Sequence, residues 1–261
     1  MRPGILTLTT DFGGDGPYVA SLKGVVLGLA PGTTLVDVTH RISPQNILEG
    51  AFVLCGIVDA FPAGTVHLAV VDPGVGTDRR LVAALIAGQW FVGPDNGLLG
   101  GVARGRRPEV VRELTNPALR RREVSATFHG RDIMAPAAAH LLIGGDPAEL
   151  GPPRDDVARL ANFEAVEVED GLVGEVIYRD AFGNLITNVP ASRVACCPGR
   201  WRVEVAGQVV RGLARTYADS PTGTLVALAG SAGWVEVAVV NGDAARALVA
   251  GPGTTVRFRR G

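Results

Sequence analysis

The sequence predicts an α/β N-terminal domain with a mainly parallel sheet, followed by a smaller all-β, barrel-like C-terminal domain. Strand and helix patterns alternate through residues 1–150, whereas only short strand-like runs occur in residues 164–261. Between these parts, the segment 144–156 is rich in Gly, Pro and acidic residues. We therefore place a linker over residues 151–163.

The first half alternates apolar runs of strand length with patterns of helical period. The run at 66–71 is almost continuously apolar, which is typical of a strand buried on both faces. In the segment 18–30, apolar residues such as Leu22 and Val26 recur at helical spacing. We expect strands at 5–9, 34–38, 66–71, 81–86 and 90–92, and helices at 18–30, 47–61 and 131–143.

The second half consists of short runs separated by turn residues, and several of these runs alternate apolar and polar side chains. This pattern is typical of a small antiparallel barrel or sandwich. We expect strands at 164–169, 173–179, 184–188, 201–205, 209–213, 225–229, 234–240 and 255–259.

Composition and charge exclude several functional classes. The 25 Lys and Arg residues against 26 Asp and Glu residues give a net charge of −1, which disfavours a nucleic-acid binder that depends on phosphate neutralisation. Lys23 is the only lysine, and no phosphate-binding GxxxxGK motif surrounds it. No apolar stretch reaches the roughly 18 residues of a membrane span, so we expect a cytoplasmic protein without membrane contact. The four histidines and three cysteines lack metal-ligand spacing, and we expect no catalytic metal.

Polar clusters follow two of the predicted strands and precede a predicted helix. Asp11 and Asp72 come directly after strands, and His129 comes shortly before a helix. The carboxyl ends of parallel strands lie at one edge of a sheet, and ligands bind there. We therefore expect these clusters to lie together at that edge. An aspartate at such a place can also be a simple turn or cap residue, and we favour a helix-capping role for Asp132. The coincidence of three clusters at one edge favours a functional site.

Longer motifs run through almost the whole chain in one order. The combination of DPGVGTDRR (72–80) with FHGRD (128–132) is far more specific than a single glycine motif. On these motifs the chain resembles the S-adenosylmethionine (SAM) hydroxide adenosyltransferase family, which is related to the SAM-dependent fluorinase and chlorinase. The matching stretches are TLTTDFG (7–13), VDVTH (36–40), ILEGAF (47–52), HLAVVDPGVGTDRR (67–80), PDNG (94–97), TFHGRDIMAP (127–136), FGNLITN (182–188) and GSAGWVEVAV (230–239).

The resemblance implies an enzyme that hydrolyses SAM to adenosine and L-methionine, with water attacking the ribose C5′. It implies a catalytic set of Asp72, Arg79 and His129. A histidine can accept a proton near neutral pH, and an arginine can stabilise negative charge on the water oxygen. Asp72 can orient the water or the imidazole, and which of the three takes the proton stays open. Because methionine leaves as a neutral thioether, the reaction needs no metal, and we expect no cofactor.

The resemblance also implies binding residues on both sides of the linker. Asp11 is our choice for the ribose hydroxyls, since a carboxylate accepts two hydrogen bonds from a cis-diol. Without the resemblance, a turn role for Asn184 is equally acceptable. The family site lies between the N-terminal domain of one subunit and the C-terminal domain of the next, which implies a homotrimer. The full set of implied substrate-binding residues is Asp11, Asp72, Asn184, Ser231, Glu236, Val239 and Asp180.

Two alternatives stay open beside the hydrolase. The halogenating relatives have a tyrosine in place of Asp72 and lack His129, which argues against a SAM-dependent halogenase that forms 5′-haloadenosine. The second alternative is a non-catalytic sensor that binds adenosine or SAM. Product analysis with and without halide separates the three functions.

Overall fold

The computed structural model describes residues 4–261 and divides into two units, with the division between residues 160 and 161. Each unit contains its own sheet and its own hydrophobic core. Among the described residues, no helix combines the length and the apolar character that crossing a membrane would require.

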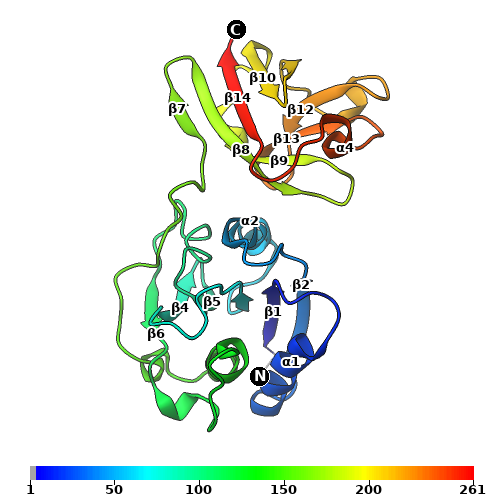
Figure 1. The fold of residues 1–261 in the computed structure, drawn as a ribbon. Coiled ribbons are helices and arrows are strands. Elements are labelled where there is room, and N and C mark those ends of the chain that lie inside the picture. The colour runs from blue at the N-terminus through cyan, green and yellow to red at the C-terminus, as the bar shows by residue number, and fades with distance from the viewer. Residues whose placement is uncertain (1–3) are drawn as a thin grey trace. The chain divides into compact units, whose positions relative to one another are not determined.

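Six strands form the sheet of the N-terminal unit, in the order β2-β1-β3-β5-β4-β6 (Figure 1). The first four strands in this order are parallel, and β4 runs antiparallel to both of its neighbours. This reversal follows from the two-residue turn Ala87-Gly88, which has positive φ at both residues and is too short for a parallel crossover. The strands are β1 (Ile5–Thr10), β2 (Thr34–Thr39), β3 (Val66–Val70), β4 (Leu81–Ile86), β5 (Gln89–Pro94) and β6 (Val110–Glu113).

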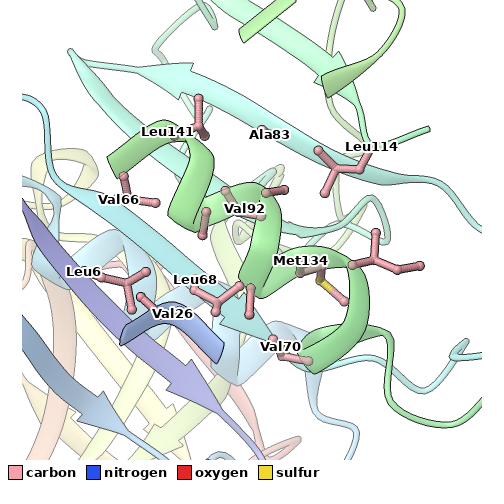
Figure 2. Packing of buried hydrophobic residues seen from close by; sticks show 14 of the residues in the cluster. Leu6, Val26, Val66, Leu68, Val70, Ala83, Val92, Leu114, Met134 and Leu141 are labelled. Carbon is pink, nitrogen blue, oxygen red and sulfur yellow. The ribbon is translucent and has the colours of Figure 1, made fainter. Parts of the chain in front are cut away.

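Helices cover both faces of this sheet. Because side chains alternate along a strand, Leu68 and Val70 of β3 lie in the core beneath α1 and α3 (Figure 2). Ala69 and Val71 lie in the opposite core, together with Leu54 of α2. The helices are α1 (Pro17–Leu29), α2 (Ile47–Ile57) and α3 (Ala135–Leu142), and α3 directly continues a π-helical turn, Gly130–Met134.

An antiparallel sheet forms the C-terminal unit, in the order β11-β10-β14-β8-β9-β13-β12, with β7 beside β8. A bridge between Ala214 and Leu228 joins the segment after β11 to β12, so the sheet curls into a nearly closed barrel. Its strands are β7 (Val166–Val168), β8 (Gly171–Arg179), β9 (Leu185–Pro190), β10 (Trp201–Val205), β11 (Gln208–Arg211), β12 (Leu225–Ala229), β13 (Trp234–Val239) and β14 (Thr255–Arg260), and its helix is α4 (Ala244–Leu248).

The predicted fold class is confirmed: a mainly parallel sheet with helices is followed by a barrel-like β unit. Strand β6 and helix α4 were not predicted from the sequence. They contain only four and five residues, which is too short for a periodic pattern to develop.

Candidate active site

Three segments meet at the carboxyl edge of the parallel strands and, together with Gln45, line one cavity of about 240 Å³. Asp11 directly follows β1, and Asp72 lies two residues beyond the end of β3. The third segment, residues 127–129, comes just before the π-helical turn. The structure thus brings the predicted clusters of Asp11, Asp72 and His129 together at one edge of the sheet.

Arg79 connects Asp72 to His129. Its Nε donates a hydrogen bond to Oδ1 of Asp72 at 2.5 Å, and its Nη2 donates to Oδ2 of the same carboxylate. The same Nη2 lies 3.2 Å from Nδ1 of His129. Since a guanidinium can only donate, we assign Nδ1 as the acceptor and place the proton of the neutral ring on Nε2. The three side chains form one hydrogen-bonded group.

Burial and charge set the protonation state of this group. The side chains of Asp72 and Arg79 are 6% and 10% exposed. The pKa of His129 lies below its ordinary value of 6.5, first because burial disfavours the charged ring and then because the positive charge of Arg79 is adjacent. The negative charge of Asp72 opposes this shift. His129 is therefore neutral at pH 7, with an electron pair on Nδ1 that can accept a proton.

Asp11 is held by a backbone group that the sequence analysis missed. The backbone N–H of Gln45 donates to Oδ2 of Asp11 at 2.8 Å, and both residues line the cavity. Gln45 has φ of 65°, a left-handed conformation that strains a residue with a side chain. Because Gln45 acts through its backbone, no preference for its side chain in the sequence could reveal this contact.

An aromatic cluster stands beside the polar groups. The rings of Phe12 and Phe128 both line the cavity, with centroids 5.6 Å apart and an edge-to-face arrangement. Tyr18 completes the cluster, at 6.0 Å from Phe12 and 5.5 Å from Phe128. The cavity therefore offers an apolar wall as well as charged groups.

The expectation that Asp132 caps a helix is wrong. Its side chain is fully buried within the π-helical turn, and the side chains of Arg121 and Arg131 donate to its carboxylate. Its Oδ2 also accepts from the backbone N–H of Ser125 at 2.9 Å. A buried carboxylate needs such partners, and here they tie the loop that carries His129 to the start of the helix.

Asn96 of the PDNG motif supports the position of Asp72. Its Nδ2 donates to the carbonyl of Val71 at 2.9 Å, and its Oδ1 accepts from the backbone N–H of Leu98 at 3.1 Å. The motif is thus a turn that also anchors the residue before Asp72.

In the C-terminal unit, two of the implied binding residues are in direct contact. Asp180 accepts hydrogen bonds from the backbone N–H groups of Phe182 and Asn184, at 2.9 and 2.8 Å. Its second oxygen accepts from Nδ2 of Asn184 at 2.9 Å. These contacts build the turn between β8 and β9.

Glu236 lies on β13 and accepts a hydrogen bond from the hydroxyl of Tyr217. Burial raises the pKa of Glu236 above its ordinary value, and the charge of Asp180 adds to this effect, whereas the bond from Tyr217 opposes it. Burial and the adjacent Glu236 likewise raise the pKa of Tyr217. Tyr217 did not stand out in the sequence analysis, because its contact spans 19 residues of chain.

Ser231 and Val239 lie apart from these hydrogen bonds. Ser231 is exposed in the turn between β12 and β13, and Val239 is half-buried against the core of the C-terminal unit. Within residues 4–261, no group of three or more His, Cys, Asp or Glu side chains is arranged to hold a metal ion.

Both units match a known family. Residues 6–151 match the SAM hydroxide adenosyltransferase N-terminal domain, and residues 174–257 match the C-terminal domain of the same name. The chain belongs to the SAM hydroxide adenosyltransferase family. The resemblance expected from the motifs is therefore confirmed.

Proteins that the chain matches over nearly their whole length are similar to it in sequence or in structure. The chain is 43% identical to an (R)-S-adenosyl-L-methionine hydrolase of Thermus thermophilus, over 99% of this chain and 100% of that protein. It is 41% identical to a protein of the same name from Salinispora arenicola, over 98% of each. An uncharacterized conserved protein from Thermotoga maritima superposes with a TM-score of 0.89 at 36% identity, over 97% of this chain and 99% of that one.

A halogenating relative is more distant. The chain is 31% identical to a fluorinase of an Actinoplanes species, over 71% of each chain. Identity and coverage are both lower than for the hydrolases of Thermus thermophilus and Salinispora arenicola.

Proposed function

We propose that this protein is an enzyme that hydrolyses SAM to adenosine and L-methionine. The observation that carries the proposal is the hydrogen-bonded group of Asp72, Arg79 and His129, of which Asp72 and His129 line one cavity with Asp11. The relatives named (R)-S-adenosyl-L-methionine hydrolase support it.

The reaction is a displacement at the ribose C5′. A bond forms between the water oxygen and C5′, and the bond from C5′ to sulfur breaks with its electron pair passing to sulfur. The positively charged sulfonium thereby becomes a neutral thioether, so the leaving group needs neither a proton nor a Lewis acid. We accordingly propose a reaction without metal or cofactor, in which the enzyme must supply orientation and a proton acceptor. In-line orientation of water can contribute about 7–11 kcal/mol at best.

His129 takes the proton from water in this proposal. Its Nδ1 carries the electron pair that accepts from Nη2 of Arg79 at 3.2 Å, and in the reaction a water takes over that contact, donating to Nδ1 and accepting from the guanidinium. Arg79 stabilises the negative charge that develops on the oxygen. Asp72 orients Arg79 through two hydrogen bonds and stabilises the imidazolium that forms.

Substrate binding follows from the remaining groups. One oxygen of Asp11 accepts from Gln45, and the carboxylate has further acceptor capacity for the ribose hydroxyls. Phe12 and Phe128 provide apolar contact for the nucleoside. In the C-terminal unit, we propose that Asp180, Asn184, Ser231, Glu236 and Val239 bind the adenine and methionine parts.

We propose a cytoplasmic homotrimer in which the cavity of one copy is completed by the C-terminal unit of the next. The cavity of about 240 Å³ supports this, because it is below the roughly 300–1,000 Å³ of usual ligand pockets. Sedimentation analysis tests the oligomeric state. A monomer that remains fully active would contradict it.

Product analysis tests the reaction. Purified protein is incubated with each sulfonium epimer of SAM, with and without chloride or fluoride, and the products are identified by mass spectrometry. We expect adenosine and methionine in equal amounts, and in oxygen-18 water we expect the label in the 5′-hydroxyl of adenosine. Accumulation of 5′-haloadenosine would instead identify a halogenase. Calorimetric binding without product would identify a sensor.

A further inference from the structure

A tyrosine outside the expected binding set contacts a buried acid within it. Glu236 is 9% exposed, and its Oε1 accepts a hydrogen bond from the hydroxyl of Tyr217. Tyr217 begins a short helix, Tyr217–Asp219, which has a capping box between Thr216 and Asp219. Since burying a carboxylate is unfavourable without a partner, this hydroxyl stabilises the ionised form of Glu236.

The backbone makes room for the second oxygen of the same carboxylate. A Cβ atom at Gly230 would lie 2.6 Å from Oε2 of Glu236, so a side chain at this position would displace the carboxylate. The two oxygens thus lie against different elements, Oε1 against the short helix and Oε2 against the turn after β12. The hydrogen bond from Tyr217 to Oε1 is therefore the contact that orients the carboxylate.

We propose that Tyr217 is a positioning residue, whose hydroxyl holds the Glu236 carboxylate in the orientation that binds SAM. This inference rests on the proposed function of the same site. Tyr217 acts through Glu236, so its loss weakens substrate binding and leaves the displacement at C5′ unchanged.

Steady-state kinetics of Tyr217→Phe test the proposal. We expect KM for SAM to rise about tenfold, the size of one lost hydrogen bond to a charged group, with kcat within about twofold of the unaltered enzyme. Thr216→Ala is the matched control, because it loosens the cap of the same short helix and leaves the hydroxyl of Tyr217 in place. We expect KM of this control to change less than about twofold.

The double variant Y217F/E236Q tests whether Tyr217 affects KM through Glu236. If Tyr217 acts through Glu236, Tyr217→Phe raises KM far less in the Glu236→Gln background. An unchanged KM in Tyr217→Phe, an equal effect of Thr216→Ala, or a full effect in the Glu236→Gln background would each overturn the proposal.

Spectrophotometric titration of the tyrosines gives a readout that does not require activity. The chain has three tyrosines. We expect one of them to ionise at lower pH in Glu236→Gln than in the unaltered protein, because the carboxylate beside Tyr217 is removed. Identical titrations would refute the contact between the two residues. If the two titrations differ as expected but the unaltered protein does not hydrolyse SAM, the contact is supported and the proposed function is refuted.

Discussion

Replacement of His129 by glutamine tests the proposed proton acceptor most directly. Glutamine keeps an acceptor for Arg79 but cannot take a proton. Among the described residues, the ring of His129 makes one hydrogen bond, to Nη2 of Arg79 at 3.2 Å, so we expect the free energy of unfolding to change by about 1 kcal/mol or less. Loss of a general base lowers kcat by about 10²–10⁴-fold, which is about 3–5 kcal/mol in the activation barrier.

The assay combines steady-state kinetics with urea unfolding followed by tryptophan fluorescence. His140→Gln is the matched control, since His140 lies in α3 of the same unit and does not line the cavity. Added imidazole should restore part of the activity of His129→Ala. A kcat of His129→Gln within about tenfold of the unaltered enzyme would refute the role of His129 as the base.

Three further predictions concern titration and reactivity. The acid limb of kcat/KM should move to lower pH in Asp72→Asn and to higher pH in Arg79→Gln, since these charges respectively raise and lower the pKa of the catalytic imidazole; pH profiles that move together would contradict this. Burial lowers the pKa of His67 below 6.5, so the unfolded chain binds more protons below that value. Its contribution to stability is complete above pH 6.5 and is lost as the pH falls through the folded pKa, and urea unfolding at several pH values should show a weaker acid destabilisation in His67→Gln. Burial raises the pKa of Cys55 to about 12, so in the native protein a thiol reagent should modify exposed Cys196 faster than half-buried Cys55; equal rates would contradict this.

Much of the fold could be predicted because its strands are strongly patterned. The continuous apolar run at 66–71 became β3 and its continuation, with side chains in both cores. The antiparallel direction of β4 was not evident, since the direction of a strand depends on the turn Ala87-Gly88 and not on its own side chains. The apolar pattern of a strand shows which of its faces is buried, whereas the turn that connects it to the next strand determines its direction.

The candidate site was predictable where it depends on strand ends and residue chemistry. Asp11 and Asp72 stand where parallel strands leave the sheet, and that place alone made them candidates. The contacts of Gln45 and Tyr217 arise from distant segments, through a backbone N–H in one case and a hydroxyl in the other. For Asp132, the sequence predicted a role that the structure does not show. Its position before a helix suggested a cap, whereas hydrogen bonds from two arginines hold its carboxylate in the interior.

The glycines of the DPGVG motif explain how the local sequence builds the catalytic group. Arg79 returns over Gly74 to reach Asp72, and a Cβ atom at Gly74 would lie 2.8 Å from Cδ of Arg79. Gly76 has φ of +82°, and a Cβ there would lie 2.8 Å from the carbonyl oxygen of Ala126, in the loop that leads to His129. Both glycines are therefore required by close approach: one lets the guanidinium fold back onto the carboxylate, and the other lets the histidine loop come near enough to complete the group.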